Sequence, residues 1–230
     1  MILQNCNRIR CDRIRVVGDV HGDDVAFARA LATARFVIQL GDLVDGGPAS
    51  GACLRMAIGL QRGGRGLFLL GNHELKLLRA LLGRKVHMKP ELAETMAQID
   101  PSQRAETITA LRHAPAWVRI EDLFFVHAGF HMGMLREEAP IPVPLNHTEG
   151  LLGRALFGQV TGRTQPDGYP ERLLHWAQDI PAGLTCYVGH DRRSTDGRPW
   201  ILDNPSGGRA VFVDTGCGKG GHLSWLDLQL

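Results

Sequence analysis

Four short blocks of polar residues each follow an apolar run in this sequence. They are Gly18-Asp19-Val20-His21-Gly22, Gly41-Asp42-Leu43-Val44-Asp45, Gly71-Asn72-His73-Glu74 and Val126-His127-Ala128-Gly129. An apolar run that stops at such a block is typical of a buried strand, so each block is expected where a strand gives way to a loop. Parallel α/β proteins place their reactive groups there. Carboxylate and imidazole side chains together predict a site for divalent transition metals.

The spacing of these side chains suits a site with two metal ions. Asp19 and His21 are two residues apart, so in an extended segment their side chains point the same way. Asp42 ends the neighbouring strand and is the candidate bridge between two ions about 3.5–4 Å apart. The other candidate ligands are Asn72, His127 and His190. Each of the six has a simpler explanation by itself, as a turn former or a locally hydrogen-bonded histidine. Together they favour a metal site.

The elements that must position these residues follow a β-α-β-α-β-α order at the start of the chain. Strands are predicted at 14–17, 36–40 and 67–70, with helices after Asp23 or Asp24, from Pro48, and over about 74–82. This order predicts a parallel sheet with right-handed crossovers.

The second half of the chain is expected to add further strands to the same domain. Residues 117–120 and 123–126 predict a hairpin, and short strands are predicted at 184–188, 210–213 and 223–228. Residues 153–170 are rich in Gly, Thr and Pro and predict a loop over the site. We expect one domain, 1–230, with a helical insert at about 84–113.

Composition excludes few functions: the 44% hydrophobic and 22% charged residues are typical of an ordinary soluble globular protein. The net charge of +2 gives no indication of bulk nucleic-acid or membrane binding. Five cysteines without a Cys-x-x-Cys pair indicate neither a disulfide framework nor a structural zinc site. No apolar run approaches the ~20 residues that a membrane helix needs, and the N-terminus does not resemble a signal peptide. A cytoplasmic location is expected.

With these blocks in order, the chain resembles the calcineurin-like metallophosphoesterases, and more narrowly the phosphoprotein phosphatase (PPP) family. The later segments 156–162, 167–170 and 214–217 resemble its small bacterial branch. That branch includes diadenosine tetraphosphatase-like enzymes and the phosphatase module of bacterial polynucleotide kinase–phosphatase, although no kinase P-loop is present here. The resemblance implies an α/β fold, a β-sandwich of mixed sheets with flanking helices and a βαβαβ start.

The resemblance also implies roles for individual residues. One metal ion would be held by Asp19, His21 and Asp42, and the second by Asp42, Asn72, His127 and His190. His73 would protonate the leaving oxygen while Asp45 orients its ring. The carboxylate would also raise the pKa of the imidazole, which suits an acid. Asp214 would hold a ligand or water, and its simpler explanation is a turn residue.

Two departures from the family pattern bear on the substrate. Gly46 stands where the family has an arginine that grips phosphate, a bond worth about 1.5–3 kcal/mol. The loop arginines Arg163 and Arg154 are the first candidates to replace it, ahead of Arg192 and Arg193. Asp191 follows His190 where relatives commonly have Thr or Ser, and it would either disfavour a highly charged substrate or pair with Arg192.

The sequence therefore predicts a dinuclear-metal phosphoesterase in which a metal-bound hydroxide attacks a phosphomonoester or phosphoanhydride. A protein-serine/threonine-phosphatase-like activity is the first interpretation. A bis(5'-nucleosyl)-tetraphosphatase-like nucleotide hydrolase and a non-catalytic metal-binding relative are the alternatives. Two divalent ions are expected, with Mn first and Fe, Zn, Ni or Mg also compatible with the ligands. The expected partner is a phosphoprotein or nucleotide substrate, with no membrane partner.

Overall fold

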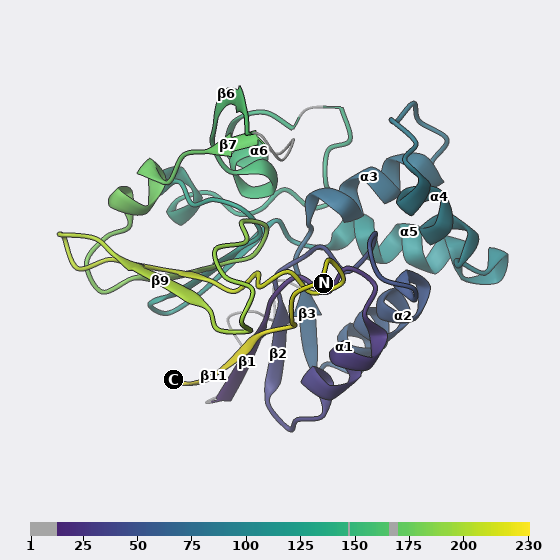
Figure 1. Ribbon diagram of the computed structural model, residues 1–230, viewed down its shortest axis with the longest axis horizontal. Coiled ribbons are helices and arrows are strands. Elements are labelled where there is room, and N and C mark those ends of the chain that lie inside the picture. The colour runs from purple at the N-terminus through teal and green to yellow at the C-terminus, as the bar shows by residue number, and fades with distance from the viewer. Residues whose placement is uncertain (1–12, 147, 166–169) are drawn as a thin grey trace.

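The computed structural model describes residues 13–146, 148–165 and 170–230, and two β-sheets form its centre (Figure 1). The strands are β1 (Arg13–Val17), β2 (Phe36–Gln39), β3 (Gly66–Phe68), β4 (Trp117–Ile120), β5 (Leu123–Val126), β6 (Val160–Thr164), β7 (Pro170–Arg172), β8 (Thr185–Val188), β9 (Trp200–Asp203), β10 (Arg209–Phe212) and β11 (Trp225–Gln229). The helices are α1 (Asp24–Leu31), α2 (Ser50–Arg62), α3 (Asn72–Leu81), α4 (Pro90–Ala97), α5 (Arg104–His113) and α6 (Gly150–Phe157). Short 3₁₀ helices are η2 (Pro101–Gln103), η3 (Met132–Leu135) and η4 (His175–Asp179).

The first sheet has the strand order β11-β1-β2-β3. β1, β2 and β3 are parallel and are connected through α1 and α2, which confirms the predicted βαβαβ start. Asp23 caps α1 by accepting a hydrogen bond from the backbone N–H of Ala26 at 2.9 Å. β11 pairs antiparallel with β1, so the sheet is mixed.

The second sheet has the order β4-β5-β8-β10-β9. β4 and β5 form the predicted antiparallel hairpin, while β5, β8 and β10 are parallel. The edge strand β9 is a strand that the sequence pattern did not predict. Its residues are largely exposed, so no buried face marks it in the sequence.

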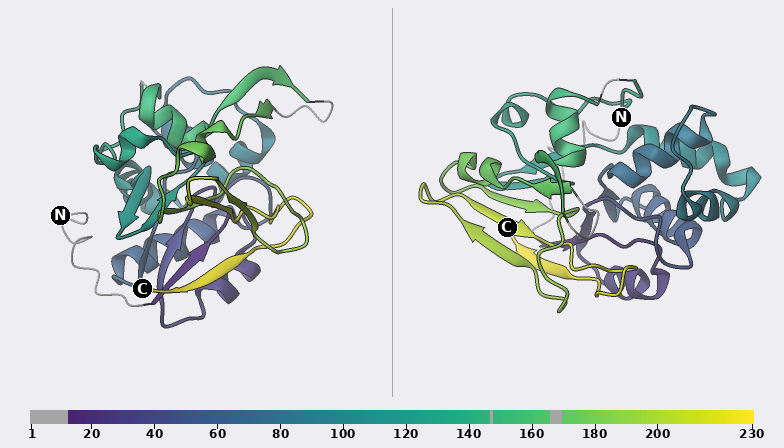
Figure 2. Two further views of the ribbon diagram at one scale, coloured as in Figure 1. Left: turned by 90° about the vertical axis from the view of Figure 1, so that its left-hand side faces the viewer. Right: turned by 45° about the horizontal axis from the view of Figure 1, so that its top comes forward.

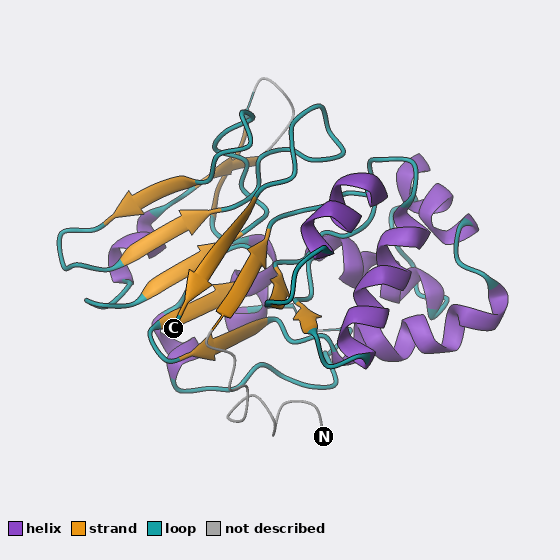
Figure 3. Cartoon of the chain, turned by 90° about the horizontal axis from the view of Figure 1, so that it is seen from below, coloured by secondary structure: helices purple, strands orange, loops and turns teal. Residues whose placement is uncertain are grey.

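The two sheets pack face to face (Figure 3). Apolar side chains from both sheets fill the space between them. Ile14, Val16 and Ile38 of the first sheet meet Phe125 and Val211 of the second in one buried cluster. Val17 belongs instead to the cluster that includes helix residues, so β1 is covered on both faces. This arrangement confirms the expected β-sandwich with flanking helices.

Helices cover the outer faces of the sandwich and gather mainly on one side (Figures 1 and 3). The predicted insert at 84–113 contains α4, η2 and α5, of which α4 and α5 contact α2 and α3. On the second sheet, Leu152, Ala155 and Leu156 of α6 and Trp176 of η4 are buried in the same cluster as Phe212. Helices therefore cover the outer face of each sheet.

The predicted loop over residues 153–170 is wrong in its described part. Residues up to Phe157 belong to α6, because Leu152, Ala155 and Leu156 give that segment one buried helical face. Val160–Thr164 and Pro170–Arg172 then form the β6–β7 hairpin, which projects from the rest of the chain (Figure 2). Residues 167–169 lie outside the described residues.

Two further findings concern cysteines and membranes. Cys53, Cys186 and Cys217 are buried free thiols, whereas Cys6 and Cys11 lie outside the described residues.

Within the described part of the chain, no helix combines the length and hydrophobicity needed to cross a bilayer.

Candidate metal centre

The six candidate ligands come together at the carboxyl ends of the parallel strands. Asp19 and His21 follow β1, Asp42 follows β2, and Asn72 begins α3 after β3. His127 and His190 follow β5 and β8 of the other sheet. Of these, His21, Asp42, Asn72 and His190 line a cleft of about 430 Å³, and Asp19 and His127 are buried beside them at 2% and 0% exposure.

His21 presents one ring nitrogen to two carboxylates. Its Nδ1 lies 3.0 Å from the carbonyl oxygen of Val44 and 2.8 Å from that of Asp45. Carbonyls only accept hydrogen bonds, so Nδ1 carries the proton and Nε2 offers its lone pair. Nε2 lies 3.8 Å from Asp19 Oδ2 and 3.8 Å from Asp42 Oδ2. Burial lowers the pKa of His21 to about 4, so the ring is neutral at neutral pH.

His127 is the centre of a second group of donors. Its Nδ1 lies 2.8 Å from the carbonyl oxygen of Leu40, which directs Nε2 into the site. Nε2 lies 3.1 Å from Asn72 Oδ1, 3.1 Å from His190 Nδ1 and 3.4 Å from Asp42 Oδ1. Although burial opposes the charged ring, the Asp42 carboxylate raises the pKa of His127 to about 9.

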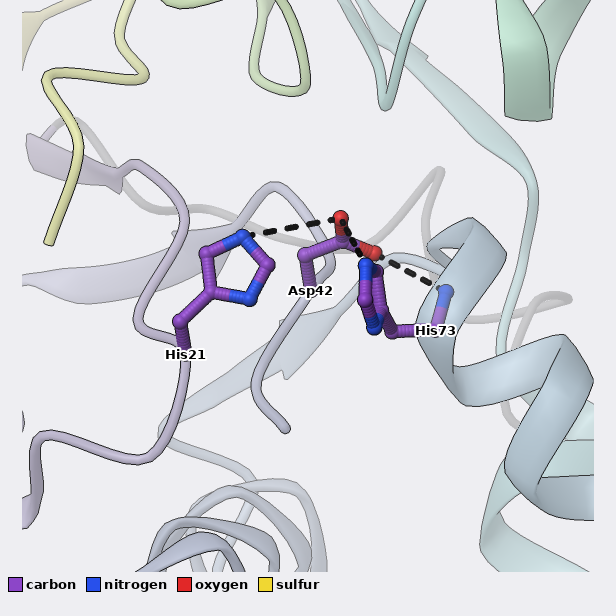
Figure 4. A group of neighbouring side chains, drawn as sticks. All are labelled: His21, Asp42 and His73. Atoms are coloured by element: carbon purple, nitrogen blue, oxygen red, sulfur yellow. Dashed lines mark hydrogen bonds and ion pairs between the residues drawn. The ribbon is translucent and has the colours of Figure 1, made fainter. Parts of the chain in front are cut away.

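Asp42 belongs to both groups of donors. One group joins it to His21 and His73 and the other to His127 and His190, each with its ligand atoms within 4.8 Å of one another. Figure 4 shows the Asp42 carboxylate between His21 and His73. Its Oδ1 also accepts a hydrogen bond from the backbone N–H of His73 at 3.1 Å. A Cβ on Gly71 would lie 2.3 Å from Asp42 Oδ1, so only glycine permits this approach.

Backbone strain is concentrated at this site. Among the described residues, five that are not glycine have positive φ, and four of them are His21, Asp42, Asp45 and His190. Such conformations cost about 1–3 kcal/mol each and persist where the surrounding structure enforces them. Of these four residues, His21, Asp42 and His190 line the cleft, and Asp45 contacts His73 at its rim.

Buried carboxylates converge here, and this arrangement fits divalent cations. Burial and the neighbouring Asp214 carboxylate raise the pKa of Asp19 well above its usual range. Burial also opposes the charge of Asp42, but the His127 and His73 charges hold its pKa well below the usual range. A bound divalent ion relieves the repulsion between such carboxylates, and the N and O donors suit a transition metal.

His73 lies at the rim of the same site. Its Nδ1 is 2.8 Å from Asp45 Oδ2, and Asp45 Oδ1 accepts a hydrogen bond from Thr95 Oγ at 2.7 Å. Thr95 comes from α4, so the helical insert holds the carboxylate that orients His73. Nothing in the sequence marks Thr95 for this contact.

Glu74 is a second residue to which the sequence pattern assigned no role. Its carboxylate accepts hydrogen bonds from the backbone N–H groups of Asp42, Leu43 and Gly71 at 2.7, 2.8 and 3.1 Å. The side chain is fully buried, and burial followed by the charge of Asp42 raises its pKa to about 7. It joins the loop after β2 to the start of α3.

The structure places neither Arg163 nor Arg154 in the wall of the cleft. The Arg163 side chain is 83% exposed and lies 4.0 Å from Glu171, and Arg154 packs beside Gly129. The cationic side chains that do line the cleft are Arg172, Arg192, Arg193 and Lys219. The Nζ of Lys219 lies 2.9 Å from Nε2 of His21.

Asp191 and Asp214 both line the cleft. Asp191 pairs with Arg193 and, at 3.8 Å, with Arg172, instead of the expected Arg192. Asp214 accepts a hydrogen bond from the backbone N–H of Gly216 at 2.9 Å. Among the described residues, Asp214 makes no hydrogen bond to a candidate ligand. Its bond to Gly216 is typical of a turn residue, and its carboxylate acts on Asp19 only through its charge.

Comparisons with known proteins agree with this geometry. The asymmetrical bis(5'-nucleosyl)-tetraphosphatase PrpE of Halalkalibacterium halodurans is 28% identical over 239 aligned positions, which cover 92% of this chain and 88% of the relative. A symmetrical bis(5'-nucleosyl)-tetraphosphatase of Acidovorax ebreus is 42% identical over 124 positions, 49% of this chain and 42% of the relative.

Solved structures show the same fold. One that is assigned provisionally to the diadenosine tetraphosphatases has a TM-score of 0.61 at 24% identity, covering 96% of this chain and 90% of its own. A protein serine/threonine phosphatase from Saccharomyces cerevisiae has a TM-score of 0.60 at 12% identity, and the match covers 97% of this chain and 82% of the phosphatase. The sequence model of the calcineurin-like phosphoesterases matches residues 12–204, which include all six candidate ligands. The chain therefore belongs to the calcineurin-like phosphoesterase family, whose members are metal-dependent hydrolases of phosphate esters.

Proposed function

We propose that this enzyme hydrolyses bis(5'-nucleosyl) tetraphosphates with the help of two divalent metal ions. Asp19, His21 and Asp42 would hold one ion, and Asp42, Asn72, His127 and His190 would hold the other. When bound, these ions would supply Lewis-acid polarisation of the phosphoryl group. The tetraphosphatase names of relatives that align over most of the chain support this substrate.

The cationic wall of the cleft is the observation that carries the proposal. Arg172, Arg192, Arg193 and Lys219 line the cleft beside the two donor groups. Asp191 pairs with Arg172 and Arg193, so Arg192 and Lys219 are the cations of this wall that form no ion pair with a described carboxylate. A phosphoserine side chain presents a single phosphate, whereas a tetraphosphate chain presents several charged groups in a row. Guanidinium groups bind such oxygens through two parallel hydrogen bonds, so a set of them favours a polyphosphate.

His73 is positioned to protonate the leaving phosphate oxygen. Although burial opposes the charged ring, the Asp42 and Asp45 carboxylates raise the pKa of His73. Asp45 holds Nδ1, which leaves Nε2 directed at the cleft, and the side chain is 24% exposed there. A proton on Nε2 can therefore be transferred without movement of the backbone.

The protein serine/threonine phosphatase interpretation stays a prediction. The likeness to the yeast phosphatase, at 12% identity, concerns the fold and not the substrate. A non-catalytic relative is disfavoured because the six candidate ligands and the His73–Asp45 pair are all present.

The test is a matrix of metals against substrates with the purified chain. Mn, Mg, Ni and Zn are combined with diadenosine tetraphosphate, a phosphopeptide, an aryl phosphate and a 3'-phosphorylated oligonucleotide. We expect the highest kcat/KM on diadenosine tetraphosphate, with Mn among the activating metals. Nucleoside monophosphate and triphosphate should be the products, as the word asymmetrical in the names of the relatives implies.

Asp42→Asn should lose both metal content and turnover, because it changes the carboxylate that both donor groups share. Asp203→Asn makes the same chemical change at an exposed carboxylate on β9 and is the control. A higher kcat/KM on the phosphopeptide, or no turnover of the dinucleotide with any metal, would reject the proposed substrate.

A further inference from the structure

A second depression lies along α3 and shares the lining residue Asn72 with the cleft of the metal centre. We call it the α3 groove; it has a volume of about 740 Å³, and Asn72 lines both it and the cleft. Lys76 and Arg79 lie one and two helical turns beyond Asn72 on the same face of the helix. The groove therefore leads away from the metal centre for about 10 Å along the helix axis.

The α3 groove is cationic and lacks compensating carboxylates. Its positive side chains are Lys76, Arg79, Arg84 and Lys85, and its described lining includes no Asp or Glu. None of these four cations forms an ion pair with a described carboxylate, whereas seven arginines elsewhere in the described chain do.

Two hydrogen bonds fix the arginines of the groove. Arg79 Nε donates to the carbonyl oxygen of Leu145 at 3.0 Å, and Arg84 Nη1 donates to the side chain of Asn146. Partial burial and the charge of Arg84 lower the pKa of Arg79. Two guanidinium groups that line one groove, with no carboxylate in its described lining, form a ready site for an anion.

The groove also has an apolar part that a phosphate chain alone does not use. Leu75, Val86 and Leu145 line it together with Phe157. Phe157 is 40% exposed, at the end of α6. An exposed aromatic ring beside cationic side chains is a common platform for a nucleobase, because bases stack on such rings with little regard to sequence.

We propose that the α3 groove binds the distal part of the dinucleotide, with its cations on the phosphates farthest from the metal centre and Phe157 against the distal base. This inference rests on the proposed function and names the substrate part that the groove recognises. A binding site of two helical turns suits one nucleotide and is too short for extended contact with a nucleic-acid backbone.

The first test removes the two exposed cations of the groove. In the Arg84→Ala/Lys85→Ala double variant, the ratio of kcat/KM for diadenosine tetraphosphate to that for an aryl phosphate should fall about tenfold, chiefly through KM. Affinity for a methylene-bridged, non-hydrolysable diadenosine tetraphosphate should fall equally when titrated by calorimetry. Arg29→Ala/Arg112→Ala removes two exposed cations elsewhere and is the control for net charge.

The second test separates the base from the phosphates. Phe157→Leu should weaken binding of the bridged dinucleotide about fivefold, a typical effect of losing one stacked base. Binding of adenosine 5'-tetraphosphate, which has no distal nucleoside, should change much less. Because the Phe157 ring is partly exposed, the variant is expected to fold.

The outcomes distinguish the two proposals. If the wild type hydrolyses the dinucleotide but neither variant changes the ratio or the analogue affinity, the groove inference is wrong and the proposed function stands. If the wild type neither hydrolyses nor binds the dinucleotide, both are wrong. If the double variant loses affinity for a 3'-phosphorylated oligonucleotide but not for the analogue, the groove binds nucleic acid and this inference is overturned.

Discussion

His73 has both ring nitrogens directed at carboxylates. Nδ1 lies 2.8 Å from Asp45 Oδ2, and Nε2 lies 3.8 Å from Asp42 Oδ2. The geometry alone groups His73 with His21 and Asp42 as a set that could hold a metal, whereas the family resemblance makes it a proton donor. The two roles differ in a measurable way, because a ligand controls metal content and a proton donor controls the leaving group.

His73→Ala should leave metal content close to that of the wild type while turnover falls by about 10²–10⁴. The loss should be largest for substrates with poor leaving groups and small for an activated aryl phosphate, which needs little protonation. Metal analysis and a series of aryl phosphates measure both effects. Loss of one metal ion, with equal rate losses across the series, would instead identify His73 as a ligand.

Gly46 shows why the arginine missing from this position cannot simply be restored. Its φ is +143°, a region that L-residues rarely adopt, and a Cβ there would lie 3.1 Å from the backbone oxygen of His21. We expect Gly46→Arg and Gly46→Ala to lower the free energy of unfolding by similar amounts, about 1–3 kcal/mol. Urea unfolding measures this, and kcat/KM should not rise in either. Activation by Gly46→Arg alone would show that a phosphate-binding position had been unfilled.

At the scale of elements, the metal centre depends on how the loop after β2 meets the start of α3. Glu74 accepts hydrogen bonds from the backbone of both segments, and Asp45 is held by Thr95 of α4. The helical insert and α3 thus set the positions of residues that come from the sheet edge. A change at Glu74 acts through Asp42 and not on the substrate.

Glu74→Ala should destabilise the protein much more than Glu74→Gln. The alanine leaves three buried backbone N–H groups without acceptors, each costing about 1–3 kcal/mol, whereas glutamine retains one oxygen. Urea unfolding should rank wild type, Gln and Ala in that order, and metal affinity should follow the same order. Equal stability of the two variants would show that the carboxylate does not support the loop.

At the scale of the molecule, the first described strand, β1, pairs with the last, β11, at one side of the first sheet. Arg13 lies opposite Gln229 and Val17 opposite Trp225, and Arg15 binds Asp227 through Nε and Nη2 at 2.7 and 2.9 Å. The hydrogen bonds from Arg15 lower the pKa of Asp227. Contacts between residues 212 positions apart in the sequence thus support β1, the strand that precedes Asp19.

Asp227→Asn should lower the free energy of unfolding by about 0.5–1 kcal/mol at pH 7, because the ion pair between Arg15 and Asp227 is bidentate but partly exposed. A lowered carboxyl pKa stabilises the fold above its unfolded value of about 3.9 and ceases to do so as pH falls through the folded value. The difference from wild type should therefore shrink as pH falls below about 4 and disappear once the pH lies below the lowered pKa of the folded state. Asp203→Asn breaks a more exposed ion pair with Arg209 and should lower the free energy of unfolding by less in the same urea titrations. Equal costs, or a difference that persists in acid, would contradict this account.

Sequence alone identified the strands, helices and polar blocks because these depend on local patterns. The buried runs at 14–17 and 36–40 mark central strands, and Asp19, Asp42 and Asn72 stand just beyond strand ends. Parallel strands bring their carboxyl ends to one edge, so the meeting of the six candidate ligands follows from order along the chain. The exposed strand β9 has no buried face to mark it, and helix α6 was missed because the Gly, Thr and Pro residues of its segment favoured a loop.

Only the tertiary structure decided which charges surround that edge. Lys219 meets His21 from 198 residues away, and Thr95 reaches Asp45 from a separate helix. Arg154 and Arg163 lie in the expected segment, but its helix and hairpin place Arg172 in the cleft wall instead. No motif in the sequence marks Lys76, Arg79, Arg84 and Lys85. Their shared groove exists because α3 packs beside the 145–146 loop and the end of α6, a contact between distant segments that no local pattern encodes.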